Sequence, residues 1–190
     1  MFLCSKAHIV AITLAVTFML ASSAQASPVQ DYSAYCTGAG GTVEEMPAEF
    51  NTSTGRMIGQ TKLFCSFSVD NGFIAIGLET FSSEKPSIAA TYIKKLGELG
   101  PESALWKGSA SNPSHNVCKN LGGAEIGFVS TGGFTNPLGE SDICVFGDGS
   151  MVSSWSLIYM ANHRDGYDNV KNQVKAEPLT PCVRIVVTSS

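Results

Sequence analysis

The sequence lacks most features of a nucleic-acid-binding or membrane-spanning protein. Charged residues make up only 15% of its 190 residues, and no cluster of Lys or Arg occurs. This argues against nucleic acid or anionic lipid as the main partner. Beyond the amino-terminal segment, no apolar run is long enough to cross a bilayer, which takes about 20 residues. We therefore expect no stable membrane insertion.

Metal-binding and catalytic signatures are also scarce. No C-x-x-C motif occurs, and the only histidines beyond the amino-terminal segment, His115 and His163, lie far apart in no ligand motif. Structural zinc needs four close nitrogen or sulfur ligands, so we predict no metal site and no cofactor. A G-x-S-x-G nucleophile motif is absent, and the acidic pairs Glu44-Glu45 and Glu140/Asp142 are more simply explained as solvated loop acids. The sequence predicts a protein that is not an enzyme.

Residues 1–26 have the three parts of a cleavable secretory signal peptide. Lys6 precedes a short apolar run, and Ala24-Gln25-Ala26 gives an A-x-A exit before Ser27. An uncleaved anchor is the alternative, but no basic stop-transfer flank follows the run. Cleavage would leave 164 residues in the periplasm or the medium. Without Lys6, 11 basic residues stand against 16 acidic ones, a net charge of about −5.

Five cysteines remain after cleavage, and in an exported chain they are expected to form disulfides. Two of them begin the same motif, C-x-x-x-G-G, at Cys36 and at Cys118. Two others, Cys65 and Cys144, are each followed two residues later by Phe and then by an Asp/Gly turn. Because these elements recur in the same order at similar intervals, an internal duplication is the better explanation.

The predicted fold class is α+β: two tandem disulfide-stapled modules, each a short helix on a three-stranded antiparallel meander. In the second module Asn112 is the expected N-cap of the helix. The other expected elements are a helix capped by Asp31, strands at 42–46, 62–68, 73–81, 125–130, 142–146 and 151–159, and loops at 47–61 and 131–141. A helix lying on a sheet can bring Cys36 to Cys65 and Cys118 to Cys144. Each bridge would stabilise its module by about 3–4 kcal/mol.

The chain divides into four parts on this interpretation. Residues 1–26 are the signal peptide, 27–97 the first module with a following helix, 98–111 a linker, and 112–190 the second module with a carboxyl-terminal strand. The helix after the first module is predicted by Ile88, Tyr92 and Leu96, which recur every four residues.

The second module resembles a known family on specific residues. The segment Asn112-Pro113-Ser114, the cysteine–glycine motif at Cys118, the Cys144-x-Phe146-x-Asp148-Gly149 turn and Trp155 resemble small exported bacterial proteins of a domain-of-unknown-function family often labelled haemolysins. The resemblance covers about 112–159, with a diverged copy at about 31–81.

The departures from the family pattern bear on the disulfides. A third family cysteine is replaced by Val152 in one copy and by Ala75 in the other. Since both copies keep the first two cysteines and lack the third, the resemblance implies the pairs Cys36–Cys65 and Cys118–Cys144. Cys182 is left without an obvious mate, as a buried thiol, a displaced family cysteine or a link to another chain.

Three functions remain open from the sequence. The first is an exported non-enzymatic binding or inhibitor-like protein, which presents its long loops to a protein or an envelope component. The second is the membrane-acting toxin that the family label implies, although no cationic amphipathic segment is present. The third is an unrecognised hydrolase. Trp155 is a core residue, or a ligand platform if it is exposed. The sequon at Asn51 matters only in a eukaryotic host.

Overall fold

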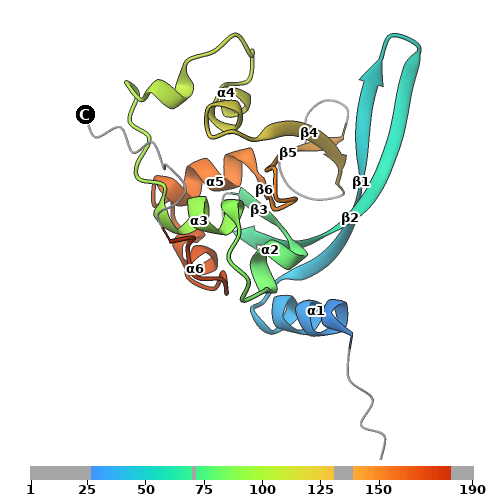
Figure 1. Cartoon of the computed structure of the whole chain (residues 1–190), viewed down its shortest axis with the longest axis vertical. Helices are drawn as coiled ribbons and strands as arrows, with labels where there is room; N and C mark the ends of the chain where they lie inside the picture. The colour runs from blue at the N-terminus through green and yellow to red at the C-terminus, as the bar shows by residue number, and fades with distance from the viewer. Residues whose placement is uncertain (1–26, 70–71, 131–138, 181–190) are drawn as a thin grey trace, which may run out of the picture.

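A computed structural model describes residues 27–69, 72–130 and 139–180 (Figure 1). A helix, three strands and a helix follow one another twice along the chain, and short helices lie between and after the two series. The first series is α1 (Pro28–Gly38), β1 (Thr42–Thr52), β2 (Gly55–Val69), β3 (Gly72–Gly77) and α2 (Leu78–Ser82). The second is α4 (Pro113–Asn120), β4 (Ala124–Val129), β5 (Glu140–Val145), β6 (Met151–Ser153) and α5 (Ser154–Ala161). Helices α3 (Ile88–Lys95) and η1 (Ala104–Trp106) lie between them, and α6 (Tyr167–Lys171) follows.

All six strands form one closed antiparallel barrel in the order β1-β2-β3-β6-β5-β4. Consecutive strands pair within each series, and the two series meet where β1 pairs with β4 at Ala48–Phe128 and where β3 pairs with β6 at Ile76–Val152. The structure thus confirms the α+β class, with strands from both halves of the chain in a single sheet.

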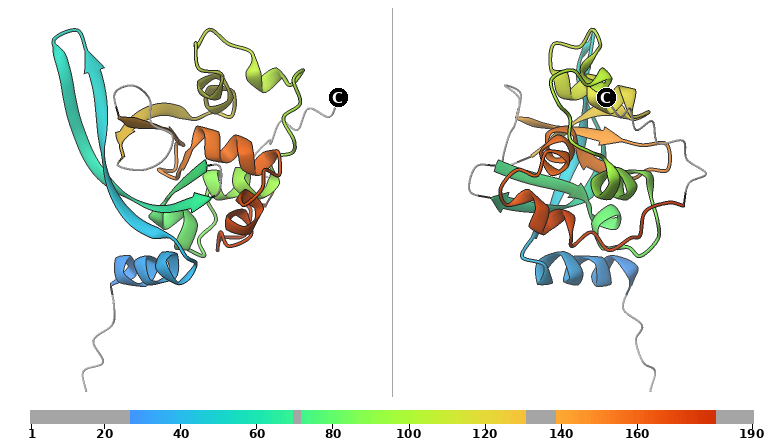
Figure 2. Two further views of the ribbon diagram at one scale, coloured as in Figure 1. Left: turned by 180° about the vertical axis from the view of Figure 1, so that it is seen from behind. Right: turned by 90° about the vertical axis from the view of Figure 1, so that its left-hand side faces the viewer.

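The side chains of the strands build two apolar layers, because successive residues point to opposite faces. One layer, which includes Met46, Phe64, Phe128 and Ile143, fills the barrel. The other lies on the outer face, where alternate residues such as Ile76 pack under the helices. Figure 2 shows these helices gathered around one side of the barrel, with the β1–β2 hairpin extending beyond them.

Capping residues fix where α1, α3 and α4 begin. Ser27, and not Asp31 as predicted, is the N-cap of α1: its side chain accepts from Gln30, whose own side chain accepts from the Ser27 amide. Asn112 caps α4 as predicted, with Pro113 in the first turn. The predicted helix after the first series is confirmed as α3, which begins after Ser87.

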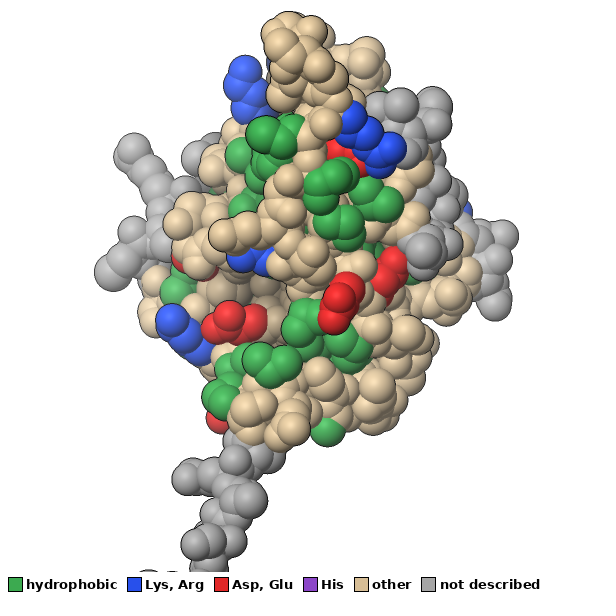
Figure 3. Space-filling view, turned by 90° about the vertical axis from the view of Figure 1, so that its right-hand side faces the viewer, with side chains coloured by type: hydrophobic (Ala, Val, Ile, Leu, Met, Phe, Trp, Pro, Cys, Tyr) green, Lys and Arg blue, Asp and Glu red, His purple; other side chains and the backbone are tan. Residues whose placement is uncertain are grey.

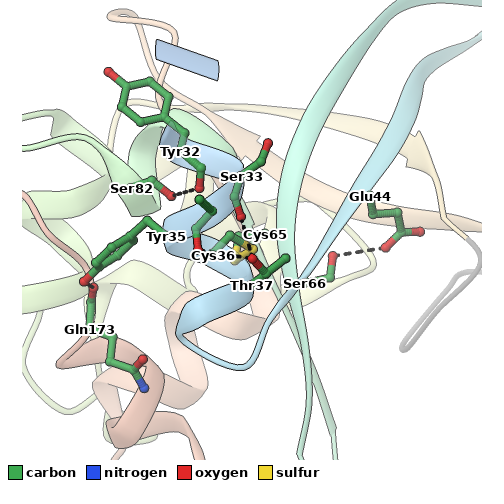
Figure 4. Close-up of a disulfide and its surroundings, with 11 residues drawn as sticks. Tyr32, Ser33, Tyr35, Cys36, Thr37, Glu44, Cys65, Ser66, Ser82 and Gln173 are labelled. Atoms are coloured by element: carbon green, nitrogen blue, oxygen red, sulfur yellow. Dashed lines mark hydrogen bonds between the residues drawn. A yellow bond between two sulfur atoms is a disulfide. The ribbon is translucent and has the colours of Figure 1, made fainter. Parts of the chain in front are cut away.

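Both predicted disulfide pairs are present. Cys36 on α1 bonds Cys65 on β2, and Cys118 on α4 bonds Cys144 on β5, so each bridge ties a helix to a middle strand. Figure 4 shows the first of these bridges under α1, next to Tyr35, whose hydroxyl donates to the backbone oxygen of Gln173 at 2.8 Å. Each bridge is buried.

The glycine pair of the repeated motif has two separate roles. The first glycine ends the helix in the left-handed region, with φ of 87° at Gly40 and 85° at Gly122. The second lies against the disulfide. A Cβ at Gly41 would lie 2.7 Å from the Cys65 sulfur, and one at Gly123 would lie 2.9 Å from the Cys118 sulfur and closer still to that of Cys144. The motif therefore ends a helix and makes room for a bridge.

Three predicted elements were wrong in extent. The predicted loop 47–61 is a hairpin, formed by the continuation of β1 and β2 to a turn between Thr52 and Gly55. The predicted strands 73–81 and 151–159 both turn into helices part-way, at Leu78 and Ser154. Short apolar runs carry no periodicity that separates a buried strand from a buried helix.

Some predictions fall outside the described residues: the signal peptide, most of the loop 131–141, Cys182 and the carboxyl-terminal strand. Among the residues that are described, none of the helices has the length and apolar character needed to cross a membrane.

Candidate functional site

A polar cluster lies beside the second disulfide, where α4 packs against β4 and β5. His115 is three residues before Cys118, so both project from the same side of α4. Glu125 on β4 is paired with Cys144 on β5, and Asp142 is two residues before Cys144, on the same face of the strand. The Cys118–Cys144 bridge therefore holds His115 over the two carboxylates.

The distances show how closely the three side chains converge. Nε2 of His115 lies 3.2 Å from Oδ2 of Asp142 and 3.8 Å from Oε1 of Glu125. This nitrogen is inaccessible to solvent and has no hydrogen-bond partner of acceptable geometry among the described residues. The imidazole as a whole is 35% exposed, and the side chains of Glu125 and Asp142 are 14% and 18% exposed.

Two further residues orient the carboxylates. The hydroxyl of Ser154, the first residue of α5, donates to both oxygens of Glu125 at 2.9 and 2.8 Å. The side-chain amide of Asn112, the N-cap of α4, donates to Oδ2 of Asp142 at 2.8 Å. Both carboxylates are thus fixed by donors from helix termini before His115 is considered.

The electrostatic environment of Glu125 is unusual for a carboxylate. Burial raises the pKa of Glu125 to about 7, although the hydrogen bond from Ser154 and the charge of His115 lower it. The negative charge of Asp142 acts in the same direction as burial. This carboxyl group therefore changes its protonation state near neutral pH.

This arrangement can bind a cation better than it can perform acyl transfer. One imidazole nitrogen and two carboxylate oxygens lie within 4.8 Å of one another, and these are ligand types of divalent transition metals. The neighbouring cysteines are not ligands, because their sulfurs are joined in the disulfide. Ser154 is buried and donates to a carboxylate instead of to an imidazole, so it is not an activated nucleophile.

Nothing in the fold requires polar residues here. The first disulfide has apolar or small residues at the corresponding positions. Ser33 lies three residues before Cys36, Val43 lies seven residues after it, and Leu63 lies two residues before Cys65. Val43 and Leu63 pack against the apolar core.

The chain matches no family model, no curated protein and no solved structure. The resemblance to the family labelled haemolysins, over about 112–159 with a diverged copy at about 31–81, therefore stays a prediction from the sequence.

A second candidate region is the hairpin formed by β1 and β2, which we call the arm (47–61). Phe50, Met57 and Ile58 on the arm are 38%, 53% and 56% exposed. Figure 3, which faces the arm, shows hydrophobic side chains in patches along this side of the molecule. At the inner end of the arm, a cavity of about 580 Å³ opens between α1, β2 and the β5–β6 turn.

Trp155, predicted as a core residue or a ligand platform, is half-buried. Its ring stacks on that of Tyr159 with centroids 5.4 Å apart, and it packs at the margin of an apolar cluster with Val117 and Ile158. It is therefore part of the packing between α4 and α5.

Sequence reasoning missed Glu125 and set aside His115 and Asp142. A signal was present: a histidine one helical turn before one cysteine, and an aspartate two residues before its partner. Glu125 joins them only because β4 pairs with β5 in a particular register, which the sequence pattern does not specify.

Proposed function

We propose that this is an exported, non-enzymatic binding protein that holds an extended segment of a partner protein along the outer edge of β2. β2 pairs with β1 from Gly55 to Ser66 and with β3 only from Phe64 onward. Over residues 55–63, no described strand lies on its second side. Such an edge presents backbone amide and carbonyl groups to which another strand can bind.

The side chains of the arm suit a protein partner. Single exposed apolar residues are ordinary, but three of the four large exposed apolar side chains of the described residues lie on this hairpin. β2 carries the basic residues Arg56 and Lys62 and no acidic one. Arg56 is bound to Glu49 of β1, and Lys62 donates to Gln60. An extended segment with alternate apolar residues and a carboxylate would complement this edge.

The cavity offers an anchor at the inner end of the edge. Thr61, Lys62 and Leu63 of β2 line it, opposite Tyr32 of α1 and Leu78 of α2. At about 580 Å³ it lies within the usual range of ligand sites. A strand bound along 55–63 would reach it with an apolar side chain.

We further propose that the two halves are diverged copies of one module, built as a helix on a three-stranded meander. The repeated order of elements, the matching disulfides and the matching glycine pairs support this. The copies have diverged most in the arm, since β1 and β2 have 11 and 15 residues and β4 and β5 have six each.

The decisive experiment uses a displayed library of short random peptides as the probe. Peptides selected on the oxidised mature protein should alternate apolar residues, include an acid and slow amide exchange within 55–63. Ile58→Lys should weaken their binding by about tenfold or more, because an interfacial apolar contact is lost. Ala34→Lys, which adds the same charge at an exposed position of α1, should not. Peptides that protect other amides, or that bind both variants equally, would refute the proposal.

A further inference from the structure

We propose that His115, Glu125 and Asp142 form a binding site for a divalent transition-metal ion. The three donor atoms come from three different elements and converge within 4.8 Å. An ion held at about 2.0–2.2 Å by nitrogen and oxygen ligands keeps neighbouring donor atoms roughly 3.0–3.6 Å apart. The distances of 3.2 and 3.8 Å from His115 to the two carboxylates need only a few tenths of an ångström of adjustment.

The orientation of His115 supports an ion between the three groups. Its Nε2 points at two carboxylates from a position closed to solvent, and no hydrogen bond of acceptable geometry reaches it from the described residues. An imidazole and two carboxylates favour ions such as Zn²⁺ and Mn²⁺ over Ca²⁺, which takes oxygen ligands. Three protein ligands leave coordination positions for water or for a group of a bound partner.

The neighbours have the roles that outer residues of metal sites have. The buried hydroxyl of Ser154 holds both oxygens of Glu125, and Asn112 holds Asp142. Hydrogen bonds of this kind orient ligands and raise the affinity for the metal. The Cys118–Cys144 bridge fixes α4, and with it His115, over the sheet.

The site is specific to the second half of the chain. The corresponding residues of the first half, Ser33, Val43 and Leu63, provide no pair of carboxylates and no imidazole. The same packing of a helix on two strands thus exists in this protein without the polar cluster. The cluster is therefore not a requirement of the fold.

The test is calorimetric titration of the oxidised, chelator-treated mature protein with Zn²⁺, Mn²⁺ and Ca²⁺. We expect one Zn²⁺ or Mn²⁺ per chain, with Ca²⁺ bound at least tenfold more weakly. His115→Gln and Asp142→Asn should abolish this binding, and Ser154→Ala should weaken it by about tenfold or more. His163→Gln is the matched control, because His163 also pairs with a carboxylate, Asp168, at 2.9 Å but lies outside the site.

A second measurement uses the unmodified protein, so it tests the proposal even if the variants fail to fold. Co²⁺ should give visible absorption bands of a nitrogen–oxygen site, displaced by Zn²⁺, and should broaden nuclear resonances of the His115 ring before those of His163. Absence of any Zn²⁺ or Mn²⁺ binding would overturn the proposal and leave His115, Glu125 and Asp142 as a polar cluster that binds no metal. Binding lost equally in His163→Gln would overturn it as well.

Discussion

The second glycine of the repeated motif gives a sharp test of how the disulfide and the backbone are packed. Gly123→Ala would place a methyl carbon 2.9 Å from the sulfur of Cys118 and closer still to that of Cys144. Both sulfurs are buried, so the bridge or the strand has to move. Overpacking of this kind costs about 1–3 kcal/mol of the free energy of unfolding.

The first glycine serves as the matched control. Gly122 has a φ of 85°, and nothing lies within 4 Å of the position of an added Cβ. Gly122→Ala should therefore cost about 1–2 kcal/mol from left-handed backbone strain alone. The two adjacent substitutions differ in mechanism although their expected costs overlap.

A double-mutant cycle separates the two mechanisms. In the background Cys118→Ala/Cys144→Ala the sulfurs are absent, so the cost of Gly123→Ala should fall by at least about 1 kcal/mol. The cost of Gly122→Ala should stay the same. The assay is urea unfolding, monitored by tryptophan fluorescence and circular dichroism. The same double-mutant cycle at Gly41 and Cys36–Cys65 is an independent repeat of the test. An unchanged cost of Gly123→Ala in both backgrounds would refute the reasoning.

Four further outcomes are expected. Replacing either disulfide by two alanines should lower the free energy of unfolding by about 3.5 kcal/mol in urea melts, because the bridges span 29 and 26 residues. Asp148→Asn should destabilise the protein fully above about pH 4 and progressively less at lower pH. Burial acts to raise the pKa of Asp148, but hydrogen bonds from Ser150 and from the amide of Ile88 outweigh it and lower the pKa. The carboxylate therefore stabilises the folded state until the pH falls through its lowered pKa. Thermal melts from pH 7 to pH 2 check this. Protein recovered from the periplasm or the medium should have the intact mass of a chain that begins at Ser27, the N-cap of α1. A full-length chain in the cytoplasm would contradict this. The protein that begins at Ser27 has a net charge of about −5 and should leave dye-loaded anionic liposomes intact, because anionic lipid repels it.

The sequence predicted those parts of the fold that depend on local chemistry. The bounds of α4 were predictable from Asn112, Pro113 and the glycine pair, because a cap, a fixed φ and a left-handed residue act within a few residues of each other. The disulfide pairs were predictable because each half of the chain has one cysteine before a glycine pair and one before a Phe and an Asp/Gly turn. The closed barrel was not, since its closure rests on pairs such as Ala48–Phe128 and Ile76–Val152, which join residues far apart in the chain.

The strand-to-helix transitions were mispredicted for a common reason. In the segments 73–81 and 151–159, apolar residues continue from the strand into the helix, because both elements are buried on the same core. Composition therefore does not change where the backbone changes. The arm was mispredicted in the opposite sense. Its Gly, Thr and Asn residues suggested a loop, but pairing between β1 and β2 extends through them to the turn.

The comparison of the two halves separates what the fold requires from what function can use. In both halves a capping residue and a proline begin the helix, a left-handed glycine ends it, and a second glycine lies against a buried disulfide. Two differences between the halves are prominent. One is the arm, where β1 and β2 extend well beyond the length of β4 and β5. The other is the set of positions beside the bridge, where Glu125 and Asp142 replace Val43 and Leu63. A buried carboxyl group with a raised pKa costs stability compared with an apolar residue. In the first half, Val43 and Leu63 pack against the apolar core at these positions. The polar residues Glu125 and Asp142, together with the arm, are therefore the places where a function is to be sought.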